Sequence, residues 1–197
     1  QDKSKMFFND FYSPKRDLNK RYLVYESVNK NLHLQNEEIN YLEFGVCGAN
    51  SFKWWLNNNH NQNSNFYGFD TFEGLPEDWA TFSKGEMSAK MPVLEDKRAH
   101  FLKGLFQDTL PNFIKENKID KTKRTLVHLD ADLFSSTLYT LTTLHPYLKK
   151  GDILLFDEFN VPNHEFLAFK MYCDSYYIKP QIIAAANNYF EVAFIIV

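Results

Sequence analysis

An apolar run that passes into a glycine-containing turn and then into a helical pattern decides the fold: Tyr41-Leu42-Glu43-Phe44-Gly45-Val46-Cys47-Gly48-Ala49-Asn50-Ser51. The run from Ile39 to Phe44 predicts a buried strand that ends at Gly45. Ser51 is of a residue type that caps helices, and Phe52, Trp55 and Leu56 follow it at helical spacing. This order of strand, turn and helix is that of a βα unit. The glycines in its turn would let a ligand approach the backbone closely.

The same alternation continues to the end of the chain. Apolar runs predict further strands at 66–69, 100–103, 125–129 and 153–156, and helical spacing predicts helices at 18–32, 109–118, 135–148 and 166–173. We expect Ser135 or Ser136 to cap the helix that follows them, and Gly151, after two lysines, to end it. The last two apolar runs, 181–185 and 190–197, meet at Asn187-Asn188. Because Asn tolerates positive φ, this junction predicts an antiparallel hairpin.

These elements predict a single α/β domain over residues 1–197. We expect a Rossmann-like sheet, mostly parallel with an antiparallel C-terminal hairpin strand, and helices on both faces. Residues 1–35 form its N-terminal helical segment. Residues 71–97 lack steady periodicity and contain Gly74, Pro76, Gly85 and Pro92. A loop of this length in a compact domain is typically functional or mobile, so we interpret it as a lid.

Composition narrows the class of protein. The 197 residues carry a net charge of −3, which leaves no basic surplus for a phosphate backbone and argues against nucleic acid as the main partner. No apolar run approaches the roughly 20 residues of a membrane span. Cys47 and Cys173 stand far apart, which predicts reduced thiols and a cytoplasmic protein. The chain starts at Gln1, so whether a segment precedes it stays open, as does its oligomeric state.

Carboxylates gather where the predicted strands end. Glu43 lies in the first strand, Asp70 ends the second, and Asp130 and Asp132 and then Asp157 and Glu158 follow two later strands. In open α/β sheets, ligands bind beyond the carboxyl ends of the strands. A single Asp there is usually a turn or cap residue. Six carboxylates on one rim would repel one another and raise each other's pKa values unless a cation joined them.

The position of Asp70 indicates a nucleoside-containing cofactor. It lies 22 residues after Gly48, where a carboxylate can accept both ribose hydroxyls of NAD or of S-adenosylmethionine. Gly45, Cys47 and Asn50 do not match the GxGxxG pattern of dinucleotide sites. The acidic rim would suit the positive charges of S-adenosylmethionine and not a pyrophosphate. We therefore favour the methyl donor, and keep an NAD-dependent oxidoreductase and a non-enzymatic cofactor-binding module as alternatives.

Five segments together resemble the macrocin O-methyltransferase-like (TylF-like) enzymes, class I S-adenosylmethionine-dependent methyltransferases that methylate sugar hydroxyls of antibiotics. The segments are Glu43–Val46, Tyr67–Pro76, Lys103–Pro111, Leu129–Thr137 and Gly151–Phe159. The resemblance implies a metal-assisted O-methyltransferase with a hydroxylated small-molecule acceptor, possibly a sugar. It also implies a Mg²⁺ ion or a similar divalent cation. The chain is short for the family, which leaves the acceptor class open.

The resemblance also assigns roles to residues. It implies metal binding by Asp130, Asp157 and Glu158, where the family commonly has Asp-Asp in place of Asp157-Glu158, and a general base at Asp132. It implies cofactor contacts by Glu43, Gly45, Ser51, Asp70, Phe106 and Asp108.

Other interpretations of single residues stay open at this point. Asp132 and Asp108 could each cap a helix, and Phe106 could belong to the core. His128, inside an apolar strand, is expected to be a hydrogen-bonded core residue, and His164 to lie at a solvated helix start.

Overall fold

The computed structural model describes residues 6–10, 12–79, 81–116 and 118–197. Residues 1–5 and 11 of the expected N-terminal segment, residue 80 of the expected lid and residue 117 of an expected helix lie outside these ranges. The elements are β1 (Phe8–Asn9), α1 (Lys20–Asn31), β2 (Ile39–Phe44), α2 (Asn50–Asn58), β3 (Asn65–Asp70), β4 (Ala99–Lys103), α3 (Phe106–Lys115), β5 (Arg124–Leu129), α4 (Phe134–Leu144), the short 3₁₀ helix η1 (His145–Tyr147), β6 (Ile153–Phe156), α5 (Glu165–Tyr176), β7 (Gln181–Ala186) and β8 (Glu191–Ile195).

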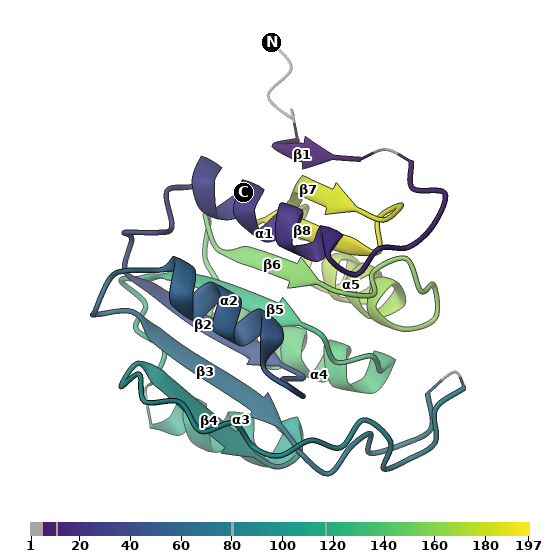
Figure 1. Ribbon diagram of the computed structural model, residues 1–197, viewed down its shortest axis with the longest axis horizontal. Helices are drawn as coiled ribbons and strands as arrows, with labels where there is room; N and C mark the ends of the chain where they lie inside the picture. The colour runs from purple at the N-terminus through teal and green to yellow at the C-terminus, as the bar shows by residue number, and fades with distance from the viewer. Residues whose placement is uncertain (1–5, 11, 80, 117) are drawn as a thin grey trace.

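The strands form one sheet in the order β1-β7-β8-β6-β5-β2-β3-β4 (Figure 1). Strands β2 to β6 pair in parallel, and β8 runs antiparallel to both β6 and β7. The expected parallel sheet with one reversed hairpin strand is therefore confirmed. The two-residue strand β1, which pairs with β7 at the edge, was not expected. It lies in a segment too short to show periodicity.

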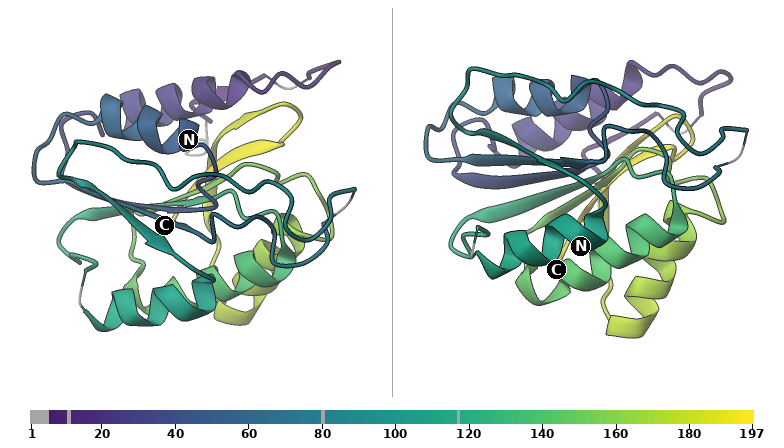
Figure 2. Two further views of the ribbon diagram at one scale, coloured as in Figure 1. Left: turned by 60° about the horizontal axis from the view of Figure 1, so that its bottom comes forward. Right: turned by 90° about the horizontal axis from the view of Figure 1, so that it is seen from below.

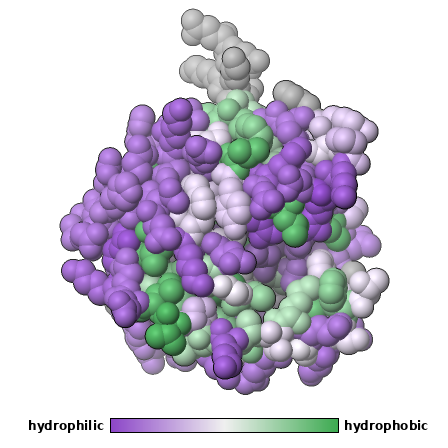
Figure 3. All heavy atoms as spheres, viewed as in Figure 1, coloured by the Kyte–Doolittle hydropathy of each residue, from purple (hydrophilic) through white to green (hydrophobic). Residues whose placement is uncertain are grey.

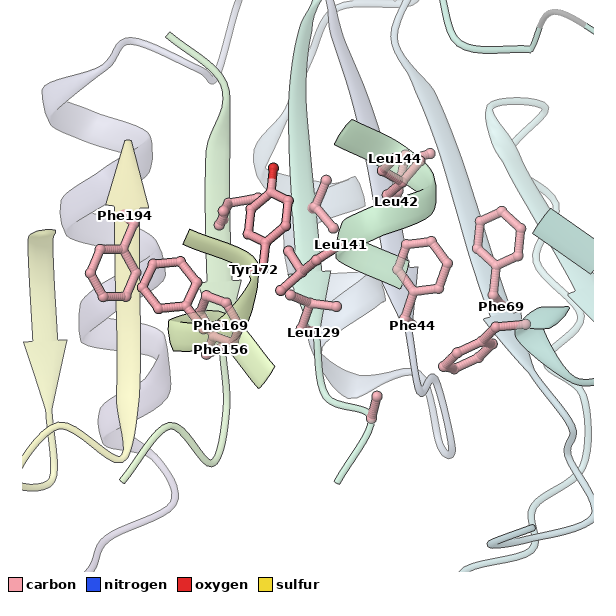
Figure 4. Packing of buried hydrophobic residues seen from close by; sticks show 14 of the residues in the cluster. Leu42, Phe44, Phe69, Leu129, Leu141, Leu144, Phe156, Phe169, Tyr172 and Phe194 are labelled. Carbon is pink, nitrogen blue, oxygen red and sulfur yellow. The ribbon is translucent and has the colours of Figure 1, made fainter. Parts of the chain in front are cut away.

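Helices cover both faces of the sheet, as expected (Figure 2). Helices α1 and α2 pack on one face around Val28, Trp55 and other apolar side chains, and α3, α4 and α5 pack on the other. Because neighbouring side chains of a strand point to opposite faces, Tyr41 joins the first cluster while Leu42 and Phe44 join the second. Figure 4 shows the second cluster, in which Phe44, Leu129 and Phe156 from the strands meet side chains of α4 and α5.

Several expected helix ends were wrong. Helix α2 begins after Ala49, and Ser51 lies inside it, with its hydroxyl 3.1 Å from that of Tyr25 and no capping bond. Helix α3 begins at Phe106, earlier than expected. Helix α4 follows Leu133 without a side-chain cap and ends at Leu144, so neither Ser135 nor Ser136 caps it and Gly151 does not end it. Because Pro146 lacks a backbone N–H, it cannot continue the α-helical hydrogen bonding.

The C-terminal hairpin forms as expected. Asn187 and Asn188 take φ values of 50° and 57°, and Tyr189 adds a third left-handed residue to the turn. The face in Figure 3 is mostly hydrophilic, with small separate apolar areas. Within the described ranges, no helix combines the length and the apolar character that a membrane crossing needs.

Candidate active site

A cleft lies where β2, β3, β5 and β6 end, on the edge to which their arrows point in Figure 1. It holds about 860 Å³ of empty space, part of it open to solvent. Residues from the strand ends, the expected lid and helices α1, α3 and α4 line it: Arg21, Gly45, Cys47, Asp70, Thr71, Gly74, Leu75, Pro76, Met87, Leu105, Phe106, Gln107, Asp130, Ala131, Asp132, Ser136, Asp157 and Glu158.

Gly45 lines the cleft at a position where no larger residue fits. Its φ is +93°, a conformation that side chains other than glycine rarely adopt. A Cβ atom at this position would lie 1.8 Å from the carbonyl oxygen of Asp130. The end of β2 can therefore pass against the loop after β5 only without a side chain, and this contact joins the two halves of the site.

Asp70 ties the turn after β2 to the end of β3. One carboxylate oxygen accepts the backbone N–H groups of Val46 and Cys47, at 2.7 and 2.8 Å, and the other accepts that of Phe72 at 2.7 Å. Each oxygen of a carboxylate has two lone pairs, so acceptor capacity remains. Asp70 also lines the cleft, so a ligand there could use the remaining acceptor position.

The predicted acidic rim forms a cluster of carboxyl groups. Oxygen atoms of Asp130, Asp132 and Glu158 lie within 4.8 Å of one another. Asp157, the fourth predicted carboxylate, lies beside them with its side chain 2% exposed. The three predicted metal ligands and the predicted base therefore lie close together. Asp132, the predicted base, is as near to Asp130 and Glu158 as a further ligand of the same ion would be.

Burial keeps protons on this cluster. Burial, followed by a hydrogen bond to Asp132, raises the pKa of Glu158 to about 10. Burial also raises the pKa of Asp132, and burial together with the charges of Asp157 and Glu158 raises that of Asp130. Without a cation, these shifts favour protonated, neutral carboxyl groups in the cluster. A bound cation would supply the neutralising charge in place of the protons.

Asp132 has a strained backbone. Its φ is +58°, and the N–H of Leu133 bonds back to the carbonyl of Ala131 at 2.5 Å. The alternative in which Asp132 caps the next helix is excluded, because α4 has no side-chain cap. Left-handed residues other than glycine cost of order 1–3 kcal/mol and cluster at functional sites. The turn directs the Asp132 side chain into the cleft.

Two arginines that were not predicted lie against the carboxylates. The guanidinium of Arg21 on α1 is 2.8 Å from Asp157 and 3.9 Å from Asp130. Arg16, which is half exposed, lies 3.5 Å from Glu158 and stacks on the ring of Phe190. No sequence signal could reveal these pairs, because the partners are more than a hundred residues apart and only the packing of α1 on the sheet joins them.

Glu165 is a third residue that the sequence did not reveal. It is fully buried in the first turn of α5, and its carboxylate accepts the N–H groups of Glu158 at 3.2 Å and Ala131 at 3.4 Å. It therefore joins the loops after β5 and β6, which carry all four acidic residues of the cluster. From the sequence alone, it is indistinguishable from a solvated residue at a helix start.

Three predicted cofactor residues do not line the cleft. Glu43 is buried on the face covered by α1 and α2, where it accepts a hydrogen bond from the hydroxyl of Tyr41. Ser51 is buried beside Tyr25. Asp108 lies in the first turn of α3, beside a separate groove, so it does not cap that helix. Phe106 does line the cleft while packing edge-on against Phe44.

The predictions for His128 and His164 had different outcomes. His128 is fully buried between the hydroxyls of Tyr25, at 3.2 Å, and Tyr41, at 2.8 Å, which confirms a hydrogen-bonded core residue. His164 stands at the start of α5, as expected, but it is partly buried beside Trp79, with ring centroids 6.2 Å apart, and not fully solvated.

The described part of segment 71–97 folds back on itself beside the cleft. The backbone of Leu75 exchanges hydrogen bonds of 2.9 Å with Gly85 and Glu86, and Leu75 and Trp79 pack on Leu133. Apart from an isolated bridge between Trp79 and Phe82, its described residues contain no strand, and they contain no helix.

The chain was compared with known proteins. The family model described as Macrocin-O-methyltransferase (TylF) matches residues 86–189, more than half of the chain. No curated protein matches it.

Solved structures share the fold. The calicheamicin methyltransferase CalS11 superposes with a TM-score of 0.66 at 22% identity, over 91% of this chain and 78% of that one. The O-methyltransferase NovP superposes with a TM-score of 0.67 at 20% identity, over 91% and 79%. The Mg-SAM form of cmcI superposes with a TM-score of 0.56 at 14% identity, over 89% and 71%.

Proposed function

The chain belongs to the macrocin O-methyltransferase family and is thus an S-adenosylmethionine-dependent O-methyltransferase; we propose that it methylates a sugar hydroxyl with the help of a divalent metal ion. One observation carries the proposal: the carboxyl groups of Asp130, Asp132 and Glu158 meet within 4.8 Å at the edge of a cleft that Gly45 and Asp70 also line.

The cleft fits the methyl donor. We assign a ribose hydroxyl to Asp70, whose carboxylate keeps one free acceptor position and is held in place by three backbone N–H groups. Gly45 leaves room beside it, and Phe106 offers an aromatic surface. The predicted contacts by Glu43, Ser51 and Asp108 have no support from the lining of the cleft. The negatively charged pyrophosphate of NAD would lie against the carboxyl groups of the acidic cluster and be repelled by them, which disfavours the NAD alternative.

The acidic cluster also fits a divalent metal ion. Among the described residues, Asp157 Oδ1 and Glu158 Oε2 are buried oxygens without a hydrogen-bond partner. Carboxylate oxygens are the ligands that Mg²⁺ prefers. We propose that Asp130, Asp157 and Glu158 hold the ion. When bound, it would make an acceptor hydroxyl more acidic and orient it. The structural neighbour cmcI with Mg-SAM supports this choice.

Asp132 would act on the acceptor itself. In the proposed reaction, the acceptor oxygen forms a bond to the methyl carbon as the carbon–sulfur bond of the donor breaks, and the hydroxyl proton goes to the Asp132 carboxylate. The left-handed turn at Asp132 holds that carboxylate at the cleft. Segment 71–97, which contributes Thr71, Leu75 and Met87 to the lining, would cover the site and exclude water.

The sugar acceptor is proposed from the family and its neighbours. CalS11 is described as a TDP-rhamnose 3'-O-methyltransferase. Carboxylates and Arg21 line the described site, and such polar groups are suited to a hydroxyl-rich ligand. A catechol or another vicinal diol is chemically similar and serves as the comparison in the test.

The cofactor assignment predicts a thermal shift that depends on Asp70. S-adenosylhomocysteine at a hundredfold excess over its Kd should stabilise the protein by about 2.7 kcal/mol, because it binds only the native state. NAD should give no shift. Asp70→Ala should remove most of the shift, and Asp108→Ala, outside the cleft, should keep it. Differential scanning fluorimetry measures all four cases. A full shift in Asp70→Ala would exclude Asp70 as the ribose ligand.

The reaction itself predicts methyl transfer to hydroxyl groups. Labelled S-adenosylmethionine should transfer its methyl to nucleotide-linked or free sugars in the presence of Mg²⁺, and EDTA should abolish the transfer because the acceptor hydroxyl then stays protonated and unoriented. Scintillation counting of the acceptor fraction measures the product. Undiminished transfer in EDTA would reject the metal, and transfer to catechols alone would reject the sugar.

A further inference from the structure

Arg21 places a permanent positive charge in the acidic cluster. Its side chain is 17% exposed and lines the cleft, with one guanidinium nitrogen 2.8 Å from Asp157 and the other 3.9 Å from Asp130. Arginine stays charged in proteins, so this group offsets one negative charge of the cluster at every pH of interest. The guanidinium therefore contacts two of the three carboxylates that we assign to the metal.

The position of Arg21 is built into the fold. Both asparagines of the β7–β8 turn clamp the segment that leads into α1. Asn188 accepts the N–H of Ser13 at 2.9 Å and donates to its carbonyl at 2.8 Å, and Asn187 does the same for Asp17 at 3.1 and 2.9 Å. Four hydrogen bonds thus fix the start of the helix that carries Arg21.

A divalent ion and the guanidinium of Arg21 would both pair with the negative charge of Asp157. Asp157 has one oxygen on Arg21 and a second oxygen that is buried without a partner. An ion at that second oxygen would lie close to the guanidinium and be repelled by it, since like charges at short range in a partly buried site interact strongly.

We propose that Arg21 is a resident counter-ion of the acidic cluster, which competes with the divalent metal for Asp157 and releases this carboxylate when the metal binds. The inference rests on the proposed function. It means that the charge of Asp157 stays paired while the protein is metal-free.

The test is the affinity of metal-free protein for Mn²⁺, a carboxylate-binding substitute for Mg²⁺, measured by calorimetry after chelator treatment. Arg21→Met should bind Mn²⁺ about tenfold more tightly than wild type, because no guanidinium has to be displaced. The same variant should have a lower Tm, since Asp157 loses its partner. Lys20→Met is the matched control: it removes one positive charge from the same helix, where Lys20 pairs with Asp10 at 2.8 Å. Its Mn²⁺ affinity should equal that of wild type.

A second measurement does not depend on the variant folding. In wild-type protein labelled with ¹⁵N, the protons on Arg21 Nη2, which contacts Asp157, should exchange slowly without metal and at least tenfold faster when Mg²⁺ is added. An unchanged exchange rate in protein that binds Mg²⁺ would overturn the inference.

The outcomes separate this inference from the proposed function. Tighter binding in Arg21→Met, or binding there alone, supports the competition. If wild type binds Mn²⁺ and Arg21→Met binds it equally or more weakly, Arg21 only holds Asp157 in place and the inference is wrong. If neither protein binds Mn²⁺, the metal part of the proposed function fails, and the inference fails with it.

Discussion

Asp132→Asn is expected to lower the turnover number by about 10²–10⁴, the usual contribution of a general base. Asn has nearly the same shape as Asp, but it cannot take the proton of the acceptor hydroxyl. The hydroxyl would then have to lose its proton to water while its oxygen attacks the methyl carbon. Single-turnover transfer of labelled methyl groups at saturating donor measures this step directly.

The same variant distinguishes catalysis from assembly of the site. Because Asp132 is assigned to the acceptor and not to the ion, Mn²⁺ affinity and the thermal shift with S-adenosylhomocysteine should stay near wild type. Asp157→Asn should behave differently, with weaker metal dependence that higher Mg²⁺ partly restores. Wild-type turnover in Asp132→Asn would remove its role as base. Loss of Mn²⁺ binding would instead make Asp132 a metal ligand, which its closeness to Asp130 and Glu158 would then explain.

Gly45→Ala is expected to destabilise the protein by about 2–6 kcal/mol. The left-handed φ of +93° costs of order 1–3 kcal/mol for alanine, and forcing a methyl group against packed backbone typically costs about 1–3 kcal/mol more. The atom that it would meet is the backbone carbonyl oxygen of Asp130, at 1.8 Å, which cannot rotate away as a side chain could. Urea unfolding followed by circular dichroism measures the loss.

Gly151 provides a matched control for this substitution. It also has a φ of +93°, but a Cβ there would meet nothing within 4 Å. Gly151→Ala should therefore show only the conformational cost, about 1–3 kcal/mol. Equal losses at the two positions would mean that the contact between Gly45 and Asp130 relaxes easily. In that case the close approach of β2 to the loop after β5 would not be needed to build the site.

The alternation of apolar runs and helical spacing was enough to predict the sheet and its reversed strand. Strand β2 occurs at the expected residues, and the hairpin forms where Asn187 and Asn188 lie, because these residues accept positive φ at little cost. Helix ends were less predictable. A capping side chain is worth only about 1 kcal/mol, and α2 begins at Asn50 without one, while the Ser51 hydroxyl lies 3.1 Å from that of Tyr25.

The sequence by itself determined the fold and five of the six carboxylates that it placed at one edge of the sheet. This follows because strands of a parallel sheet bring residues such as Asp70, Asp130 and Asp157 to the same edge, whatever the loops do. It could not decide how these carboxylates are neutralised.

Only the tertiary structure decided that Arg21 lies on Asp157, that Glu165 joins the two acidic loops and that Glu43 faces away from the cleft. These contacts depend on how helices pack on the sheet and on which face of a strand a side chain lies. These contacts leave no local pattern in the sequence. They are set by how the apolar faces of whole helices pack on the sheet.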